Sequence, residues 1–337
     1  MAVGQLTRAR LVRVNGVLLA MLAVSVVAAA AIGPVRIDWR RAFDLSLASP
    51  DAVILFRTRI PRVLMAAIVG GALATAGAAL QALLRNPLAD PHLLGVSSGA
   101  ALAGVCALVL RPVLLGHTLV VPAAAFAGAL ASMWIVVGLS RVDRRLESYT
   151  LLLVGVIYNA FAGALLMFIN SVVDFYQAHN VLFWLMGSLG TTDYTVVGAL
   201  ALYTLVGLVM LLARARDLDC LSLGDDRAAE LGVRVERARV VTFVAASLLV
   251  GAVVSVSGMI GFVGLVIPHL VRLRTGSDHR LLLPASYLAG AIFLVWADTA
   301  ARTALGGTEM PVGVVTALCG APFFVYLLRR ERRRAGM

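Results

Sequence analysis

The chain contains no lysine, and all 29 of its basic residues are arginine. An ATP-binding P-loop of the form G-x-x-x-x-G-K-[ST] needs a lysine ammonium group on the phosphates. The sequence therefore excludes a P-loop of this form. We expect no cofactor on this chain, and any ATP that drives it is expected to bind to another one.

Acidic residues are also scarce. The chain has 18 Asp and Glu, and charged residues make up 14% of it, against about 25% in a typical soluble domain. Apolar residues reach 61%, and the mean hydropathy of +0.93 indicates a membrane protein rather than two soluble domains. The net charge of +11 does not indicate a nucleic-acid partner, because the arginines punctuate apolar segments instead of forming one basic stripe.

Cysteine is rare as well. Cys106, Cys220 and Cys319 lie far apart and form no C-x-x-C motif, so we expect neither a disulfide framework nor a metal site. Arginines near the N-terminus precede an apolar run that exceeds the core of a signal peptide, which is about 7–15 residues. We therefore interpret this run as the first transmembrane helix.

Ten apolar stretches are candidates for bilayer crossings. They run over roughly 14–33, 60–82, 94–110, 118–140, 150–170, 195–213, 239–257, 260–273, 281–302 and 311–328. The eighth is short and contains Pro268, so we expect it to be broken or tilted. The sequence predicts an all-α, polytopic membrane protein with about ten transmembrane helices and a single domain over 1–337.

The arginines set the expected orientation. With a cytoplasmic N-terminus, 21 of the 29 arginines lie on the inner side, as the positive-inside rule requires. Both termini are then cytoplasmic, which requires an even number of crossings. The outer side holds Arg36, Arg40, Arg41, Arg57, Arg59, Arg62, Arg111 and Arg302.

Two parts of the chain are weakly similar to each other. Gly71-Ala72 opens a stretch that reaches Pro91-His92-Leu93, and Gly251-Ala252 opens one that reaches Pro268-His269-Leu270. The second and seventh crossings run in opposite directions, so the similarity suggests an inverted repeat, as in many transporters. Chance similarity between helices rich in Ala, Gly and Leu is the alternative.

Two inner segments interrupt the apolar pattern. The prolines of Asn86-Pro87-Leu88-Ala89-Asp90-Pro91 cannot continue a helix. Spacing alone favours a tight turn, and irregular backbone at a pore mouth is the alternative. In the longest inner loop, Asp225 is a candidate N-cap and Gly232 a natural stop for a short helix. That helix is either a solvated connector or a lever that binds a cytoplasmic partner.

Three arginines lie on the outer side against the charge bias. Arg59 and Arg62 share a helix face, and with Arg302 they either snorkel at the interface or form a cationic rim for an acidic partner. Asp298 is the clearest acid within a crossing, four residues before Arg302. It is either a functional group or half of a structural ion pair.

Along nearly the whole chain from about residue 50, the sequence resembles the FecCD-type permeases, the membrane subunits of ABC importers for siderophores, haem and vitamin B12. The strings that carry this resemblance are Arg59-Ile60-Pro61-Arg62, Gly70-Gly71-Ala72-Leu73-Ala74, Arg85-Asn86-Pro87-Leu88-Ala89-Asp90-Pro91, Leu94-Gly95-Val96-Ser97-Ser98-Gly99-Ala100, Phe183-Trp184-Leu185-Met186-Gly187-Ser188-Leu189, Gly261-Phe262-Val263-Gly264-Leu265-Val266-Ile267-Pro268-His269 and Gly320-Ala321-Pro322-Phe323.

The resemblance implies a type II ABC importer permease fold in the inner membrane. It also implies a second copy of the permease, two cytoplasmic ATPase subunits that bind ATP and Mg²⁺, and a periplasmic or lipid-anchored substrate-binding protein. The implied cargo is a bulky iron-siderophore, haem or cobalamin. From the residues alone, an ion-coupled secondary transporter that works without an ATPase is the rival function.

The resemblance also assigns roles to residues. Coupling to the ATPase falls in the segment of about 222–238, at Gly224, Asp225, Arg227, Ala228, Ala229, Glu230, Leu231 and Gly232. Docking of the binding protein falls on Arg59, Arg62 and Arg302. The gate candidates are Asn86, Leu88, Ser148 and Tyr149, and the last two differ in residue type from the family pattern. No catalytic residue is expected.

Overall fold

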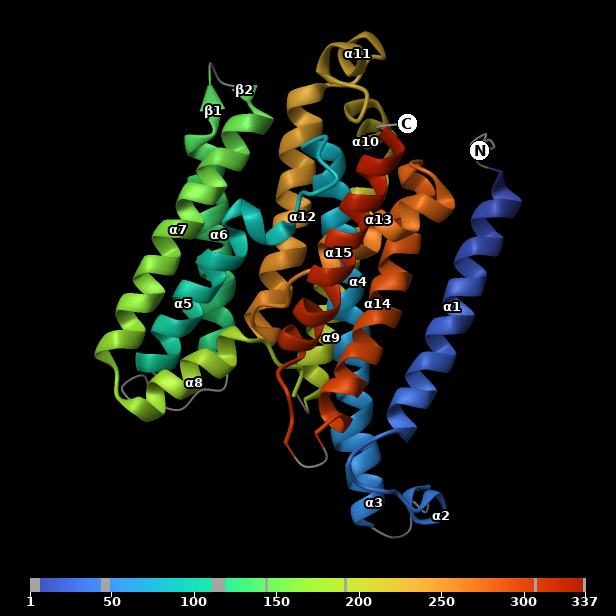
Figure 1. Ribbon diagram of the computed structural model, residues 1–337, viewed down its shortest axis with the longest axis vertical. Coiled ribbons are helices and arrows are strands. Elements are labelled where there is room, and N and C mark those ends of the chain that lie inside the picture. The colour runs from blue at the N-terminus through green and yellow to red at the C-terminus, as the bar shows by residue number, and fades with distance from the viewer. Residues whose placement is uncertain are drawn as a thin grey trace.

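The computed structural model describes residues 7–43, 49–110, 119–142, 145–190, 193–305 and 308–335. Within these ranges the chain is almost entirely helical (Figure 1). Its elements are α1 (Arg8–Ala31), α2 (Trp39–Ala42), α3 (Pro50–Ala52), the π-helical η1 (Val53–Arg59), α4 (Ile60–Leu83), the 3-10 helix η2 (Pro91–Leu94), α5 (Val96–Leu110), α6 (Val120–Leu139), β1 (Arg141–Val142), β2 (Arg145–Leu146), α7 (Ser148–Val172), α8 (Phe175–Leu185), α9 (Tyr194–Ala213), α10 (Ala215–Leu221), α11 (Asp225–Glu230), α12 (Val235–Ser257), α13 (Val263–Thr275), α14 (His279–Thr303) and α15 (Val312–Ala335).

Each of the ten predicted crossings corresponds to a helix. In the part of the chain that the structure describes, seven helices are long and apolar enough to cross a membrane, namely α1, the continuous helix Pro50–Leu83, α6, α7, α9, α12 and α14. The other three predicted crossings are the shorter apolar helices of α5 and α15 and the 13-residue α13. At 1.5 Å per residue α13 spans about 20 Å, less than the hydrocarbon core of about 30 Å, as its short apolar stretch indicated.

Several smaller elements were not predicted. The helix α8 and the two-residue strands β1 and β2, which pair antiparallel, follow no long apolar run. The helices α2 and α10 are also too short for a hydropathy pattern to indicate them. Arg111, which we assigned to the outer side, lies outside the described residues.

The bundle has two distinct ends. The helix α11 and the β1–β2 hairpin lie at one end, together with the start of α1 and the end of α15 (Figure 1). The helices α2 and α3 lie at the opposite end. We call these the α11 end and the α2 end. The first helix therefore begins, and the last helix ends, at the same end of the bundle, which agrees with an even number of crossings. The helices α4 and α12 run in opposite directions, as predicted. The inverted repeat itself stays a prediction.

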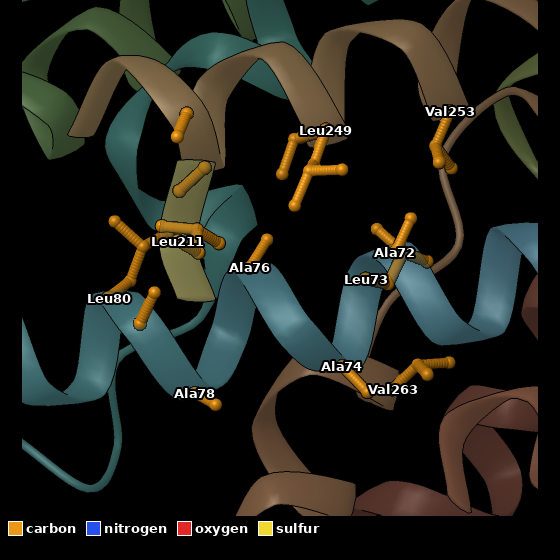
Figure 2. Close-up of a cluster of buried hydrophobic side chains, with 14 of the residues drawn as sticks. Ala72, Leu73, Ala74, Ala76, Ala78, Leu80, Leu211, Leu249, Val253 and Val263 are labelled. Carbon is orange, nitrogen blue, oxygen red and sulfur yellow. The ribbon is translucent and has the colours of Figure 1, made fainter. Parts of the chain in front are cut away.

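The helix α4 forms the centre of the bundle and packs against α12, α13 and α14. Its side chains are small, and Figure 2 shows Ala72 and Ala76 facing Leu249 and Val253 of α12. A Cβ atom on Gly77 would lie 1.9 Å from the carbonyl oxygen of Gly264 in α13. Small residues allow this backbone contact, which stabilises helix pairs in lipid, where apolar surface alone gives no preference for protein over acyl chains.

A polar network completes the contact between α4 and α13. Pro268 has no N–H group, so the carbonyl of Gly264 four residues earlier lacks its helical partner. The Gln81 amide of α4 donates to the carbonyl oxygens of Gly264 and Leu265 at 3.3 and 3.2 Å. Arg272 donates in turn to Gln81 Oε1 at 3.0 Å. The carbonyl group that Pro268 leaves unpaired is thereby satisfied from the neighbouring helix.

This packing gives a first prediction, for Gly77→Ala. The added methyl group meets the backbone of Gly264, so α4 and α13 must separate, and overpacking of this kind costs about 1–3 kcal/mol. Thermal unfolding of the detergent-solubilised protein measures the loss. Gly16→Ala is the matched control, because nothing lies within 4 Å of a Cβ atom on Gly16 of α1. Equal stability of the two variants contradicts the backbone contact.

Candidate functional site

The helix α11 is delimited by two glycines. Gly224 precedes it with φ 112° and ψ 160°, a conformation open to glycine and strained for other residues. At the other end, Gly232 has φ 85°. Its N–H donates to Ala229 at 2.9 Å, and the Val233 N–H donates to Ala228 at 3.0 Å. These two bonds form a Schellman motif, so the predicted stop at Gly232 is confirmed.

The predicted N-cap is wrong. Gly224 occupies the N-cap position, and Asp225 is the first helical residue. The Asp225 carboxylate instead accepts a hydrogen bond from Arg239 Nη2 at 2.5 Å and lies 3.9 Å from Arg85 Nη2. Ion pairing with two arginines from other parts of the chain replaces the local capping bond.

The two faces of α11 differ. Ala228 is fully buried against the rest of the chain, and its part in coupling to the ATPase stays a prediction. Arg227, Ala229 and Glu230 are exposed. So are two large apolar side chains that flank the helix, Leu223 at 56% and Leu231 at 63%.

The segment that leads into α11 is fixed to α14. Asp219 of α10 accepts the backbone N–H of His279 at 2.9 Å and lies 2.6 Å from His279 Nδ1. His279 is buried. Beside it, a hydrogen bond from the Arg280 side chain lowers the pKa of the Asp278 carboxyl, which caps α14. The chain therefore enters α11 from an anchored position.

The first predicted gate segment, which contains Asn86 and Leu88, is a hydrogen-bonded turn at the end of α4. Arg85 has φ 50°, which is uncommon for a residue other than glycine. Its N–H donates to Ala82 at 3.2 Å, and the Asn86 N–H donates to Gln81 at 3.1 Å. Asn86 Oδ1 then accepts the Leu88 N–H at 2.9 Å. The segment is thus a tight turn, and it presents Leu88 at 40% exposure.

The second gate segment lies directly beside the first. Ser148, the first residue of α7, donates through Oγ to the carbonyl oxygen of Leu83, the last residue of α4, at 3.3 Å. Tyr149 follows at 73% exposure. The structure therefore brings both predicted gate segments to the α11 end. Their gating role stays a prediction.

At the α2 end, the three arginines that we expected either to snorkel or to form a cationic rim are buried. Arg59, Arg62 and Arg302 are only 3%, 8% and 4% exposed. Their assignment to the outer side of the membrane stays a prediction, and the charge count behind it carried no information on contacts within the chain. All three guanidinium groups have partners inside the bundle.

Two of these arginines hold the first crossing. Arg59 Nη1 donates to the carbonyl oxygens of Ala30 and Ala31 at 3.1 and 2.8 Å, and its Nη2 donates to that of Val35. Arg302 donates through Nη2 to the carbonyl oxygen of Ala29 and through Nη1 to that of Ile32, each at 3.4 Å. The last carbonyls of a helix have no intrahelical partner. The arginines satisfy them and attach α1 to the bundle.

The third arginine completes a buried charge cluster. Asp298 accepts from Arg62 Nε at 3.0 Å and from Arg302 Nε at 2.9 Å. Of our two readings of Asp298, the structural ion pair is the one that the geometry supports, with Arg62 as an added partner. Arg62 Nη1 also donates to Glu309 Oε2 at 2.8 Å, and the Glu309 side chain is 55% exposed. Sequence reasoning did not find Glu309.

No group of three or more His, Cys, Asp or Glu side chains that could hold a metal occurs within the described ranges. The polar atoms at both ends of the bundle serve contacts between helices.

Comparison with known proteins identifies the family of this chain. The profile of the FecCD transport family matches residues 21–330. The chain belongs to the FecCD transport family. It is 41% identical over 323 residues to the hemin transport system permease protein HmuU of Yersinia pestis, covering 95% of this chain and 96% of the relative. It is 43% identical over 286 residues to the vitamin B12 import system permease protein BtuC of Vibrio vulnificus, covering 85% and 86%.

A solved structure agrees with the fold. It is described as an inward-facing conformation of a metal-chelate type ABC transporter, with a TM-score of 0.81 and 31% identity over 95% of this chain and 99% of that one. The predicted all-α permease fold is confirmed. This FecCD family member is a multi-span membrane permease of the ABC importer type.

The charge cluster gives a second prediction, for Asp298→Asn. The change leaves Arg62 and Arg302 buried without their shared carboxylate, and breaking a buried pair in this way costs about 3–5 kcal/mol. Thermal unfolding in detergent measures the loss. Glu309→Gln is the control, since its exposed pair with Arg62 is worth at most about 1 kcal/mol. A smaller loss for Asp298→Asn than for Glu309→Gln argues against the cluster as a structural element.

Proposed function

We propose that this chain is the membrane-spanning subunit of a binding-protein-dependent ABC importer that moves a bulky metal chelate inward, driven by ATP hydrolysis in a partner subunit. Relatives that transport hemin and vitamin B12 support this cargo class. These two relatives carry different cargoes but are about equally identical in sequence to this chain. The proposed cargo therefore includes iron-siderophores, haem and cobalamin.

The observation that carries the proposal is the surface of α11. This helix projects beyond the membrane helices at the end of the bundle (Figure 1). Leu223 and Leu231 lie exposed on either side of it, and burying such a side chain against a partner contributes about 1.5–3 kcal/mol. The exposed Arg227 and Glu230 add charges that favour one orientation. We propose that this surface enters a cleft of the ATPase.

The orientation follows from that contact. The α11 end faces the cytoplasm, so both termini are cytoplasmic and the protein resides in the inner membrane. The arginine-rich end of α15 then lies on the inner side, as the positive-inside rule predicts. The α2 end faces outward.

The outward end is where the substrate-binding protein docks. Exposed Arg36, Arg40, Arg41 and Arg57 give this end a positive surface, which steers an acidic partner. Docking through Arg62 requires an incoming carboxylate to displace the half-exposed Glu309. Arg59 and Arg302 are held by the end of α1, so their proposed contact with the binding protein needs a local rearrangement.

A second copy of the permease completes the pathway in this proposal. In the apolar window of α7 only 11% of the residues are buried within one chain, and large side chains such as Phe161, Met167 and Phe168 are exposed along this helix. A second copy packed near this face would place the Ser148 segments of the two chains close to each other.

The rival function is an ion-coupled secondary transporter. Proton coupling needs an acid that can exchange its proton. Within the described residues Asp298 is the one fully buried acid, and two arginines hold it. This arrangement favours the ABC mechanism.

Reconstitution tests the two functions, and is our third prediction. Proteoliposomes with the permease, the ATPase and the binding protein should accumulate hemin, cyanocobalamin or a ferric siderophore only with ATP and Mg²⁺. Proteoliposomes with the permease alone should accumulate none under a proton or sodium gradient. Uptake by the permease alone down an ion gradient overturns the proposal.

The surface of α11 gives a fourth prediction, for Leu231→Glu. Loss of the buried leucine should lower ATP-driven uptake and co-purification of the ATPase at least about 10-fold, since 1.5–3 kcal/mol of contact is lost. Leu305→Glu is the control, because Leu305 is 58% exposed and follows the outward end of α14. If both variants retain the ATPase equally, α11 is not the contact.

A further inference from the structure

Arg239 of α12 joins two segments that are far apart in the sequence. Its side chain is 9% exposed. Nη2 donates to Asp225 Oδ2 of α11 at 2.5 Å, and Nη1 donates to the carbonyl oxygen of Leu146 at 2.7 Å. A guanidinium group presents several donors in a rigid fork, so both bonds can form at the same time. α11 is therefore tied to the end of the β1–β2 hairpin through one side chain.

The same hairpin residue is held a second time by α12. The Leu146 N–H donates to Glu236 Oε2 at 2.9 Å. Glu236 and Arg239 are three residues apart and share a helix face. Both backbone polar groups of Leu146 are thus bound by α12, and Leu146 itself is 1% exposed. Because Ser148 follows two residues later as the first residue of α7, this contact fixes the start of α7 to α12.

Asp225 also faces the other gate segment. Arg85, which opens the turn at Asn86, has its Nη2 atom 3.9 Å from Asp225 Oδ2. A Cβ atom on Gly224 would lie 3.4 Å from Arg85 Nη1, so the Arg85 side chain lies directly beside the start of α11. The Ser148 bond to Leu83 then closes a ring that runs through α11, α12, the start of α7 and the end of α4.

We propose that Asp225, Arg239 and Glu236 are positioning residues that transmit the movement of α11 to both gate segments. The inference rests on the proposed function, in which the ATPase moves α11. α11 has six residues, and these links join it to the membrane helices. When α11 shifts, the Asp225 carboxylate draws Arg239 and Arg85 with it.

The two links differ in strength. The Arg239 side chain is buried, and charge-assisted hydrogen bonds are about twice as strong as neutral ones. Arg85 is 44% exposed at 3.9 Å from its partner, so solvent screens that pair. The path through Arg239 and Leu146 to α7 therefore carries most of the coupling, and the path through Arg85 carries less.

The fifth prediction uses the complete complex of permease, ATPase and binding protein in lipid nanodiscs. A spin label at Tyr149→Cys, with Cys106, Cys220 and Cys319 replaced by serine, reports the distance between the two copies at the start of α7. ATP and vanadate should change this distance in the otherwise unaltered complex. Tyr149 is exposed and makes no contact in the ring.

Three variants test the links, namely Asp225→Asn, Arg239→Lys and Glu236→Leu, and two further variants serve as controls. Asp225→Asn and Arg239→Lys should keep ATP hydrolysis but lower the fraction of complexes that change distance at least about five-fold, the lower limit for typical coupling between sites. The control Asp226→Asn, next to Asp225 and exposed, should behave as the parent does. Glu236→Gln should also behave as the parent, because its amide oxygen still accepts the Leu146 N–H, whereas Glu236→Leu should lose the distance change.

The outcomes separate the two proposals. If the parent complex shows no ATP-dependent change, or does not hold the ATPase, the proposed function fails. If the parent responds and Arg239→Lys and Glu236→Leu respond equally well, the transmission path is wrong while the function stands. If the Asp225→Asn complex does not assemble, Arg239→Lys and Glu236→Leu decide whether the transmission path is correct, because they leave the surface of α11 unaltered.

Discussion

Close backbone contact around α4 is the constraint on which the structure depends. In lipid, apolar surface gives helices little reason to associate, so contact distance and satisfied polar groups have to supply the stability. Glycines at 70 and 77 bring α4 against the backbones of Gly290 and Gly264. The bond from Gln81 to the carbonyl that Pro268 leaves unpaired adds a polar contact at the same interface. Together these fix the helix whose end leads into the turn at Asn86.

The bundle uses the same arrangement of charges at both ends, with different solvent access. At each end one aspartate is shared by two arginines. Asp298 is fully buried with Arg62 and Arg302, where loss of the aspartate leaves Arg302 buried without a charged partner. The Asp225 side chain is 37% exposed beside Arg239 and Arg85. The cluster at the α2 end is suited to hold three helices together, and the cluster at the α11 end is suited to a segment that moves.

The sequence predicted the helices well because long apolar runs depend on local composition. It also predicted α11, since helix-forming residues ending at Gly232 are a local signal. It could not predict that Arg59 and Arg302 bind the end of α1, because a charge count assigns a side of the membrane and not a contact. Asp225 was predicted to be an N-cap because local sequence alone does not show which distant residue a side chain contacts. Its true partner, Arg239, lies beyond the reach of any local motif, and no periodicity connects Leu146 to either residue.

The conformation of Arg85 has a consequence for how this chain can change. The turn after α4 uses a left-handed backbone that glycine would adopt at lower cost, yet the position holds a long cationic side chain that extends to Asp225. Relief of the backbone strain and retention of the ionic contact are mutually exclusive at this one residue. Replacing Arg85 with glycine would therefore relax the backbone of the turn and remove the weaker of the two ionic contacts that join α11 to the membrane helices.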